Sequence, residues 1–365
     1  MRNRYIDLLR SLAIVRVVVY HTTNWAFLTL VFPAMAVMFA LAGSLMAASL
    51  DRADVRAVAR RLRRLLPSLW AFAAIMVPAM LLLTELPVSW RLLRWLLPVA
   101  SPPSDSWGST MTGPVWYLRD YLWFVLASPL ALWLFRRWPI PTVLAPYLLL
   151  VVVELRVPDA PLVLREFGLY FGAWLLGFAH HDGMLRRMAR RMLLPLAGVL
   201  ATLGGAWIFT HPGSNGYDLN GIRLGNGLWS AAFILLLLGL APAGAAWVDR
   251  YAPLSRAVTL LNRRALTVYL WHMPIVVGLA MLTGAPGWKL DPVGLTVRLA
   301  VVAALIAVVI ALFGWVEDLA ARRRPELLPA GRPASGSGDQ GRLPGPRRPA
   351  DEAAEARERM GAGRR

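Results

Sequence analysis

Long runs of apolar residues recur along the chain from near its start to about residue 316. Four examples are IMVPAMLLLT, VLAPYLLLVVV, SAAFILLLLGLA and LAVVAALIAVVIALFGW. Each lies in a window close to the roughly 20 residues that an α-helix needs to cross the hydrocarbon core of a bilayer. The pattern predicts ten membrane-spanning helices. They are expected at residues 10–29, 31–50, 66–84, 114–135, 140–156, 164–181, 193–211, 224–242, 265–283 and 293–316.

Composition supports this class of protein. Hydrophobic residues make up 57% of the 365 residues and charged residues only 16%, whereas an average soluble domain carries about 25% charged residues. Both values argue against a single soluble globule. We predict an all-α fold, a polytopic bundle of about ten transmembrane helices.

The distribution of positive charge predicts the topology. The formal net charge is +18, and 29 of the 39 Lys and Arg residues fall in segments on one side of the predicted membrane. Those segments are 1–9, 51–65, 136–139, 182–192, 243–264 and 317–365. Because cytoplasmic loops are rich in Lys and Arg, both termini are expected in the cytoplasm, in a multi-pass protein of the plasma (cytoplasmic) membrane. This bias explains the net charge without a nucleic-acid partner.

The chain is expected to consist of a transmembrane domain, residues 1–324, and a basic cytoplasmic tail, residues 325–365. The tail is rich in Pro, Gly and Arg and cannot bury enough apolar surface to offset its chain entropy, so we expect it to be disordered. The basic start of the chain shows no small-residue cleavage pattern, and the first span is expected to be retained. The sequence contains no cysteine, which excludes disulfides and thiol nucleophiles.

The first span carries charged and titratable residues inside an apolar stretch. Arg10 and His21 are eleven residues apart, which places them about 20° apart around a helix and about 16 Å apart along it. Asp7 precedes Arg10 by three residues, close enough to pair with it. His21 is a candidate for proton transfer, because imidazole titrates near neutral pH. The alternatives are that Arg10 snorkels to the interface and that His21 only bonds between helices. Arg16, about 140° from His21, is expected to face another helix or to snorkel.

A second histidine lies inside the ninth predicted span. His272 follows Arg264 by eight residues, which places it about 12 Å into the membrane, at a depth similar to that of His21. Tyr269 lies three residues earlier and can take part in hydrogen bonding. In the fourth span, Arg119 and Asp120 are about 100° apart on a helix, and each is expected to need its own partner.

The remaining polar positions near the membrane are expected at its interfaces. Glu166 begins the sixth span at the outer interface. Of the two longer outer loops, 85–113 and 211–223, the first could include an amphipathic helix at Trp90–Leu97. The other histidines are expected to be solvated rather than to bind a metal: His180, His181 and His211.

Four arginines cluster just before the third span. Arg61 and Arg64 are three residues apart and share a helix face, and guanidinium groups bind phosphates bidentately. The alternative is that the cluster only sets the orientation of the span. The other two members are Arg60 and Arg63.

Several of these stretches, in this order, resemble the acyltransferase-3 family of integral-membrane acyltransferases. YIDLLRSLAIVRVVVYH is similar to the opening pattern of that family, which has an Arg and a His separated by ten residues, here Arg10 and His21. VMFALAGSLMAASL and RRLRRLLP resemble its next motifs, the second being an Arg-x-x-Arg before a Pro. GPVWYLRDYLWFVLASPL resembles its central Trp-Tyr-Leu segment, and RRALTVYLWHMP resembles its late Tyr-Leu-x-His pattern.

The resemblance implies transfer of an acyl group, above all acetyl, from cytoplasmic acyl-CoA to a hydroxyl or amine of a carbohydrate, lipid or secondary metabolite. His21 would be the general base or the acyl acceptor, and Arg10, steadied by Asp7, would orient the donor or stabilise the thioester oxygen. His272 would be a second proton-transfer or oxyanion group. The Arg61 and Arg64 pair, with Arg60 and Arg63 beside it, would hold the phosphates of CoA. No metal is implied.

A rival hypothesis is a transporter or flippase for a glycan or lipid, in which the same buried charges would line the substrate path. Against it, the sequence shows no inverted repeat and no matched pair of Gly/Pro-broken spans in two halves. Another membrane O-acyltransferase fold, which pairs an Asn with a distant His, is disfavoured because it lacks the Arg-ten-His spacing.

Overall fold

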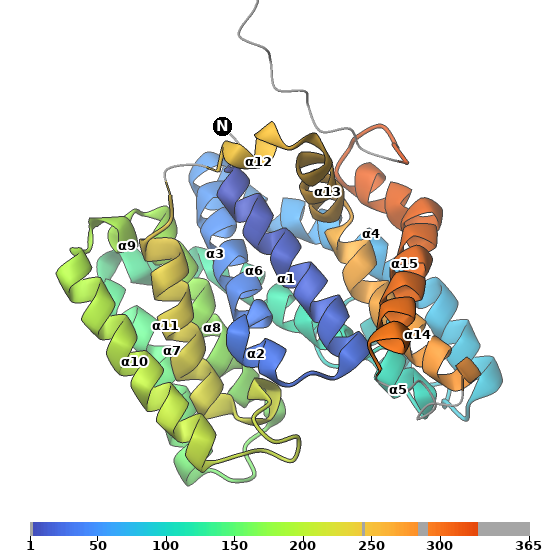
Figure 1. Ribbon diagram of the computed structural model, residues 1–365, viewed down its shortest axis with the longest axis horizontal. Coiled ribbons are helices and arrows are strands. Elements are labelled where there is room, and N and C mark those ends of the chain that lie inside the picture. Colours follow the sequence, from blue (N-terminus) through green and yellow to red (C-terminus); the bar gives the residue numbers. More distant parts are fainter. Residues whose placement is uncertain (1–2, 243–244, 284–290, 328–365) are drawn as a thin grey trace, which may run out of the picture. The chain divides into compact units, whose positions relative to one another are not determined.

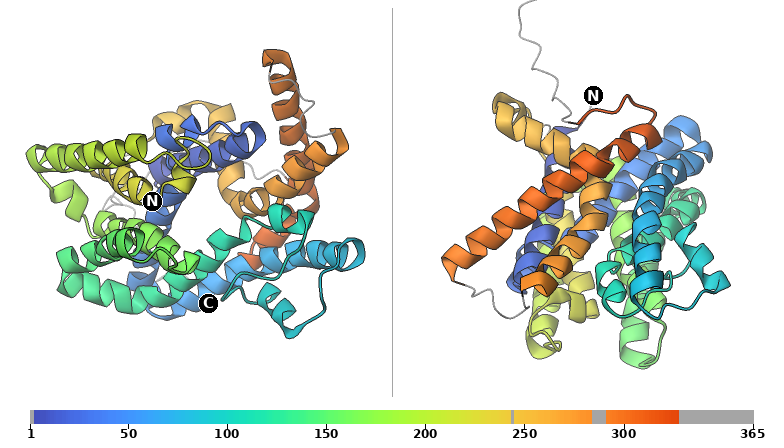
Figure 2. Two further views of the ribbon diagram at one scale, coloured as in Figure 1. Left: turned by 90° about the horizontal axis from the view of Figure 1, so that it is seen from below. Right: turned by 90° about the vertical axis from the view of Figure 1, so that its right-hand side faces the viewer.

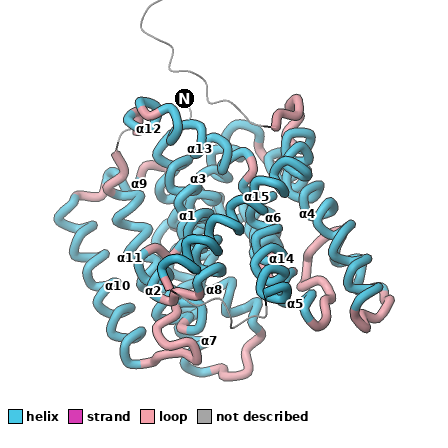
Figure 3. The backbone as a smooth tube through the Cα atoms, turned by 45° about the vertical axis from the view of Figure 1, so that its right-hand side comes forward, coloured by secondary structure: helices cyan, strands magenta, loops and turns pink. Residues whose placement is uncertain are grey.

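The computed structural model describes residues 3–242, 245–283 and 291–327. Within these ranges the regular structure is helical, and the single β-type pairing is an isolated bridge between Gly213 and Gly216. Figure 3 shows these helices with the loops that join them. The predicted all-α fold is confirmed. The predicted tail, residues 325–365, lies outside the described residues except for its first three positions.

Fifteen α-helices and two short 3-10 helices follow one another along this part of the chain (Figure 1). They are α1 (Arg4–Thr23), α2 (Phe27–Val31), α3 (Ala34–Ala53), α4 (Arg56–Leu83), η1 (Trp90–Trp95), α5 (Trp107–Met111), α6 (Val115–Arg137), α7 (Pro139–Arg156), α8 (Leu162–His181), α9 (Met184–Arg187), α10 (Arg190–Thr210), η2 (Leu219–Gly221), α11 (Arg223–Gly239), α12 (Trp247–Arg250), α13 (Ala252–Arg263), α14 (Ala265–Thr283) and α15 (Pro292–Ala320).

A helix lies at each of the ten predicted spans, and eight candidate spans are long and apolar enough to cross a membrane. The two others are α1 and α11. α1 carries four charged residues among its 20, which lowers its hydropathy, and the 17 residues of α11 fall short of a full span. Their passage through the membrane stays a prediction, as does the side on which the termini lie.

The boundary between the first two spans differs from the prediction. α1 ends at Thr23, because Asn24 takes the left-handed conformation (φ 57°) and its N–H closes the last turn on Tyr20. Pro33 then stands directly before α3, where its fixed φ suits a helix start but disfavours helix in the residue before it. The short helix α2 fills the gap, so three helices replace the two predicted over residues 10–50.

The first of the two long loops predicted on the outer side, residues 85–113, folds back onto the bundle. Its helix, η1, is a 3-10 helix that ends two residues before the predicted Leu97. Trp70 of α4 donates its indole N–H to Leu96 O at 2.8 Å, and Trp123 of α6 donates to Val99 O at 2.9 Å. These bonds fasten the loop to two spans.

α3 and α8 pack closely at the centre of the bundle. A Cβ atom at Gly43 would collide with the carbonyl oxygen of Trp174, and one at Gly177 would collide with that of Ala40. Small residues let membrane helices approach closely, where van der Waals packing holds them. These two glycines therefore set the distance between the two helices.

We call the end of the bundle that holds the start of α1 together with α12 and α13 the N-terminal end, and the end that holds α2, α5 and residues 211–223 the loop end (Figure 1). At the N-terminal end, Arg4 bonds Asp249 and Ser255, which ties α1 to α12 and α13. Arg264 is 1% exposed and pairs with Asp318 at 2.7 Å, which ties α14 to α15. The right-hand view of Figure 2 shows α15 running obliquely across α14 and α4.

Candidate active site

A cavity of about 380 Å³ lies among α1, α6, α8 and α14, toward the loop end. Its volume falls within the range of about 300–1,000 Å³ that is common for ligand pockets. Aromatic and apolar side chains form much of its wall. The charged and strongly polar members of the lining are Arg16, His21, Glu166, Asn220, Arg223 and His272.

The two intramembrane histidines meet in this cavity. His21 comes from the distal part of α1 and His272 from the first half of α14, and their ring centroids are 5.1 Å apart. The helices approach each other along their length, so residues 251 positions apart in sequence share one site. The sequence placed both histidines at similar depth, and the structure brings them into contact.

The hydrogen bonding of His272 fixes which ring nitrogen faces the cavity as an acceptor. Its Nδ1 lies 2.6 Å from the carbonyl oxygen of Tyr269. A carbonyl oxygen can only accept, so Nδ1 carries the proton and Nε2 of the neutral ring holds a lone pair. His272 is 0% exposed, and its Nε2 has no hydrogen-bond partner among the described residues. A buried acceptor of this kind is available to a substrate hydroxyl.

A buried ion network lies beside the cavity and corrects two expectations. Arg119 and Asp120 pair with each other, with Nε 2.9 Å from Oδ1, because the long Arg side chain folds back over its neighbour. Arg119 also pairs with Glu166 and donates to Ser101 Oγ at 2.8 Å. Glu166 was expected at the outer interface but lines the cavity. Arg119 therefore anchors Glu166 from a neighbouring helix.

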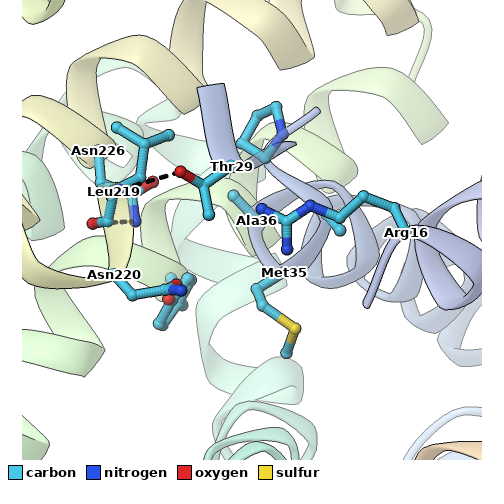
Figure 4. A pocket seen from close by; sticks show the side chains of 10 residues that line it. Arg16, Thr29, Met35, Ala36, Leu219, Asn220 and Asn226 are labelled. Carbon is cyan, nitrogen blue, oxygen red and sulfur yellow. Dashed lines mark hydrogen bonds between the residues drawn. The ribbon is translucent and has the colours of Figure 1, made fainter. Parts of the chain in front are cut away.

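Arg16 was expected to face another helix or to snorkel; it does face another helix, α2, and it also lines the cavity that holds His21. Its Nε donates to Leu28 O at 3.0 Å, and its guanidinium lies 5.0 Å from the centre of the Tyr20 ring. Figure 4 shows Arg16 reaching from α1 toward Met35 at the start of α3, beside a small adjoining pocket of about 10 Å³. The break after Thr23 folds α2 back toward α1, so Leu28 can bind a side chain that otherwise had no partner.

The loop at residues 211–223 closes one side of the cavity. The Tyr20 hydroxyl donates to the carboxylate of Asp218 at 2.5 Å, and Asn220 Nδ2 donates to the Tyr20 oxygen at 3.1 Å. The backbone N–H of Leu219 donates to Thr29 Oγ1 at 3.0 Å (Figure 4). The loop is thus fixed to α1 and α2, and it presents Asn220 and the following Arg223 to the cavity.

A second polar region lies at the N-terminal end. Arg10, Arg61 and Arg323 are all close enough to Arg64 to interact with its charge. Arg10 also lies within electrostatic range of Tyr117. One positively charged surface is therefore formed by α1, α4 and the residues after α15. We call this set, Arg10, Arg61, Arg64 and Arg323, the arginine surface; its charge is suited to bind an anion.

The four arginines of the α4 cluster differ in their surroundings. Arg61 is half-buried, and its Nη2 donates to Leu45 O at 2.8 Å and to Ser49 Oγ at 3.0 Å on α3. Arg64, Arg60 and Arg63 are exposed, and no hydrogen bond or ion pair holds them within the described ranges. Arg61 joins two helices, whereas the donors of Arg64 are not committed to any group in the described part of the chain.

The predicted pairing of Asp7 with Arg10 is wrong. Among the described residues, the guanidinium that pairs with Asp7 is that of Arg4, at 3.9 Å. Both arginines are three residues from Asp7, on opposite sides in sequence, so spacing alone could not choose between them. Arg10 is left to face Arg64 and Tyr117.

The paired histidines at the end of α8 are bound rather than simply solvated. His180 is buried, with Nδ1 2.9 Å from Ser44 Oγ, and Nε2 of His181 lies 2.8 Å from Asp51. Asp51, His181 and Asp182 have the spacing of metal ligands. Arg136, however, hydrogen-bonds both carboxylates at 2.8–3.0 Å and offsets one of their two negative charges. The arrangement is explained as an ion-pair network.

Sequence reasoning thus found both histidines and the arginine surface but missed much of the cavity wall. The sequence patterns did not single out Arg223 or Asp218. Both lie next to the start of a span, a position that is usually interfacial. The Asp-Leu-Asn run before that span was the one available signal, because Asp and Asn favour fixed turns.

Comparison with known proteins identifies one family. A family model described as an acyltransferase domain, of the acyltransferase-3 type, matches residues 3–315. The match covers nearly the whole described chain, including both histidines, the cavity lining, Arg10 and the arginines of α4. No significant match was found to a curated protein or to a solved structure.

Proposed function

Because the chain belongs to the acyltransferase-3 family of membrane acyltransferases, we propose that it moves an acyl group from cytoplasmic acyl-CoA to a hydroxyl or amine of a carbohydrate, lipid or secondary metabolite. Acetyl is the acyl group that the family resemblance favours. The observation that carries the proposal is the contact between His21 and His272 at one cavity.

In this proposal the arginine surface binds the donor and the cavity binds the acceptor. The phosphates of CoA bind the arginine surface around Arg64, and the thioester points toward the histidines. The acceptor enters the cavity from the loop end. Tyr117 and Tyr269, whose ring centroids are 5.0 Å apart, lie between the two regions.

The chemical step needs a base and a place for negative charge. His21 takes the proton of the acceptor hydroxyl while the hydroxyl oxygen forms a bond to the carbonyl carbon of the thioester. The C–S bond then breaks, and the leaving thiolate of CoA takes up the proton that His21 holds, which returns the imidazole to its neutral form. Arg10 lies on the donor side and would orient the thioester or stabilise its oxygen. His272 has its Nε2 lone pair free to accept a hydrogen bond from the same acceptor.

An alternative within the same site is that His21 is itself acylated before the acceptor binds. The two routes differ in kinetics, because a covalent intermediate gives ping-pong behaviour and protein-bound acyl groups without acceptor.

The test uses purified protein in nanodiscs with radiolabelled acetyl-CoA. We expect His21→Ala to bind acetyl-CoA normally but to lose about 10²- to 10⁴-fold in turnover, the usual contribution of a general base. His211→Ala is the matched control, because His211 is exposed and stacks on Trp207. If the wild type binds neither acetyl-CoA nor longer acyl-CoAs, the donor is wrong, and flux assays for a transporter become the next experiment.

A further inference from the structure

Two arginines of the cavity wall have donors that the protein itself does not use. Arg223 makes no hydrogen bond or ion pair anywhere in residues 3–242, 245–283 or 291–327. Arg16 donates a hydrogen bond only from its Nε, to Leu28 O, and its two terminal nitrogens make no hydrogen bond within the same ranges. Neither side chain is exposed, since both are half-buried. Neither side chain is among the buried polar groups without a partner, so the free nitrogens reach the cavity, where water or a ligand can accept from them.

Within the described residues the nearby carboxylates make no hydrogen bond or ion pair to these two groups, because other donors already hold them. Asp218 acts on Arg16, and Glu166 on Arg223, only through space. Glu166 is paired with Arg119, and Asp120 is paired with the same arginine. Asp218 is 5% exposed and accepts from the Tyr20 hydroxyl and from the N–H of Asn220. Each carboxylate thus serves the scaffold.

We propose that the cavity recognises an acceptor that carries an anionic group, a carboxylate or a phosphate, and that Arg16 and Arg223 bind this group. Planar guanidinium groups bind such oxyanions with two parallel hydrogen bonds. The proposal rests on the proposed function, because it names the chemistry of the acceptor for that site.

The geometry also limits where the anion lies on the acceptor. Arg16 and His21 are five residues apart on α1, which separates them by about 7.5 Å along the helix axis. The anionic group and the hydroxyl that reacts at His21 are therefore expected close to each other in the acceptor, and not at opposite ends of a long chain. Arg223, delivered by the loop at 211–223, faces the same cavity.

The test compares two ligands of the same size, methyl β-D-glucuronide and methyl β-D-glucoside, by thermal stabilisation of the full chain in phosphatidylcholine nanodiscs. We expect the glucuronide to stabilise the wild type at concentrations at which the glucoside does not. Arg16→Gln and Arg223→Gln should each weaken the glucuronide about tenfold or more, since hydrogen bonds to charged groups contribute about 1.5–3 kcal/mol. Glucose 6-phosphate in parallel tells whether carboxylate or phosphate is preferred.

The matched control is Arg91→Gln, which removes an exposed arginine of η1 outside the cavity and should leave glucuronide binding unchanged. Arg223→Lys keeps the charge but loses the planar fork, and should bind with intermediate affinity. The proposal is overturned if neither anionic ligand stabilises the wild type or if the glucoside binds equally well. It is also overturned if glucuronide binding survives in the variant that combines Arg16→Gln with Arg223→Gln.

Failure of this proposal and failure of the proposed function give different results. Hydrolysis of acetyl-CoA without acceptor, and its dependence on His21, reports on the function alone. Arg223→Gln should bind acetyl-CoA with unchanged affinity. If it binds acetyl-CoA more weakly, the cavity holds the phosphates of the donor, and the acceptor proposal is wrong.

Discussion

Arg61 and Arg64 have the same side chain and stand one helical turn apart, but they differ in what their guanidinium groups already bind. Arg61 donates to Leu45 O and Ser49 Oγ on α3, whereas Arg64 is exposed and makes no such bond within the described chain. One residue therefore contributes to both the fold and the charged surface, and the other contributes to the surface alone.

We expect Arg64→Ala to weaken acetyl-CoA binding about 10- to 100-fold, the loss of a charge-assisted hydrogen bond, with no change in melting temperature. Arg61→Ala should lower the melting temperature as well, because it frees α3 from α4. Binding isotherms and thermal melts in nanodiscs measure the two effects separately. Arg191→Ala, which removes an exposed arginine of α10 outside this cluster, is the control. Equal melting-temperature losses for Arg61 and Arg64 would contradict the distinction.

At the scale of single residues, the sequence predicted those residues that are unusual by themselves. A histidine in the middle of an apolar run, or four arginines in one turn, is visible without a fold. It could not predict the partner of a residue such as Arg119 or Asp7, because several partners fit the same spacing. It also could not show that Arg16 enters the cavity of His21, since that depends on how α2 folds back.

At the scale of elements, hydropathy predicted the positions of ten helices because the bilayer requires about the same length of apolar chain each time. What hydropathy could not show were the short elements between spans. α2 depends on Asn24 and Pro33, and η1 depends on indole hydrogen bonds from two distant helices. Such bonds join residues far apart in sequence and leave no periodic signal.

The contact between α3 and α8 gives a test of packing. Gly177→Ala should destabilise the protein, because its Cβ would meet the carbonyl oxygen of Ala40, and overpacking costs about 1–3 kcal/mol. Gly198→Ala is the matched control on α10, where a Cβ would meet no atom within 4 Å. Since Ala favours helix over Gly by about 1 kcal/mol, this control should be neutral or stabilising.

Thermal melts of the two variants in the same nanodiscs decide the question. The same substitution is expected to lower the melting temperature at Gly177 and to leave it unchanged or raise it at Gly198. This difference separates the effect of packing from that of helix propensity. Two unchanged melting temperatures would mean that α3 and α8 can move apart without cost, and that the close contact does not hold the bundle together.

At the scale of the whole molecule, the proposed chemistry needs two entrances on opposite sides of the membrane. The arginine surface is at the N-terminal end, and the cavity lies toward the loop end. In the proposed function, the donor and the acceptor reach His21 and His272 from different compartments. This arrangement agrees with the predicted positive-inside topology, in which the N-terminal end faces the cytoplasm.

The chain offers a direct test of that topology, because it contains no cysteine. Ser214→Cys, in the exposed loop at 211–223, should react with a membrane-impermeant maleimide in intact cells. Ala59→Cys, exposed near the start of α4, should react only after the membrane is permeabilised. Ala13→Cys, at a position that is 0% exposed, should stay unlabelled in both conditions and serves as the control. The reverse labelling of the first two variants would place the arginine surface outside the cell, away from cytoplasmic acyl-CoA, and would rule out the proposed donor path.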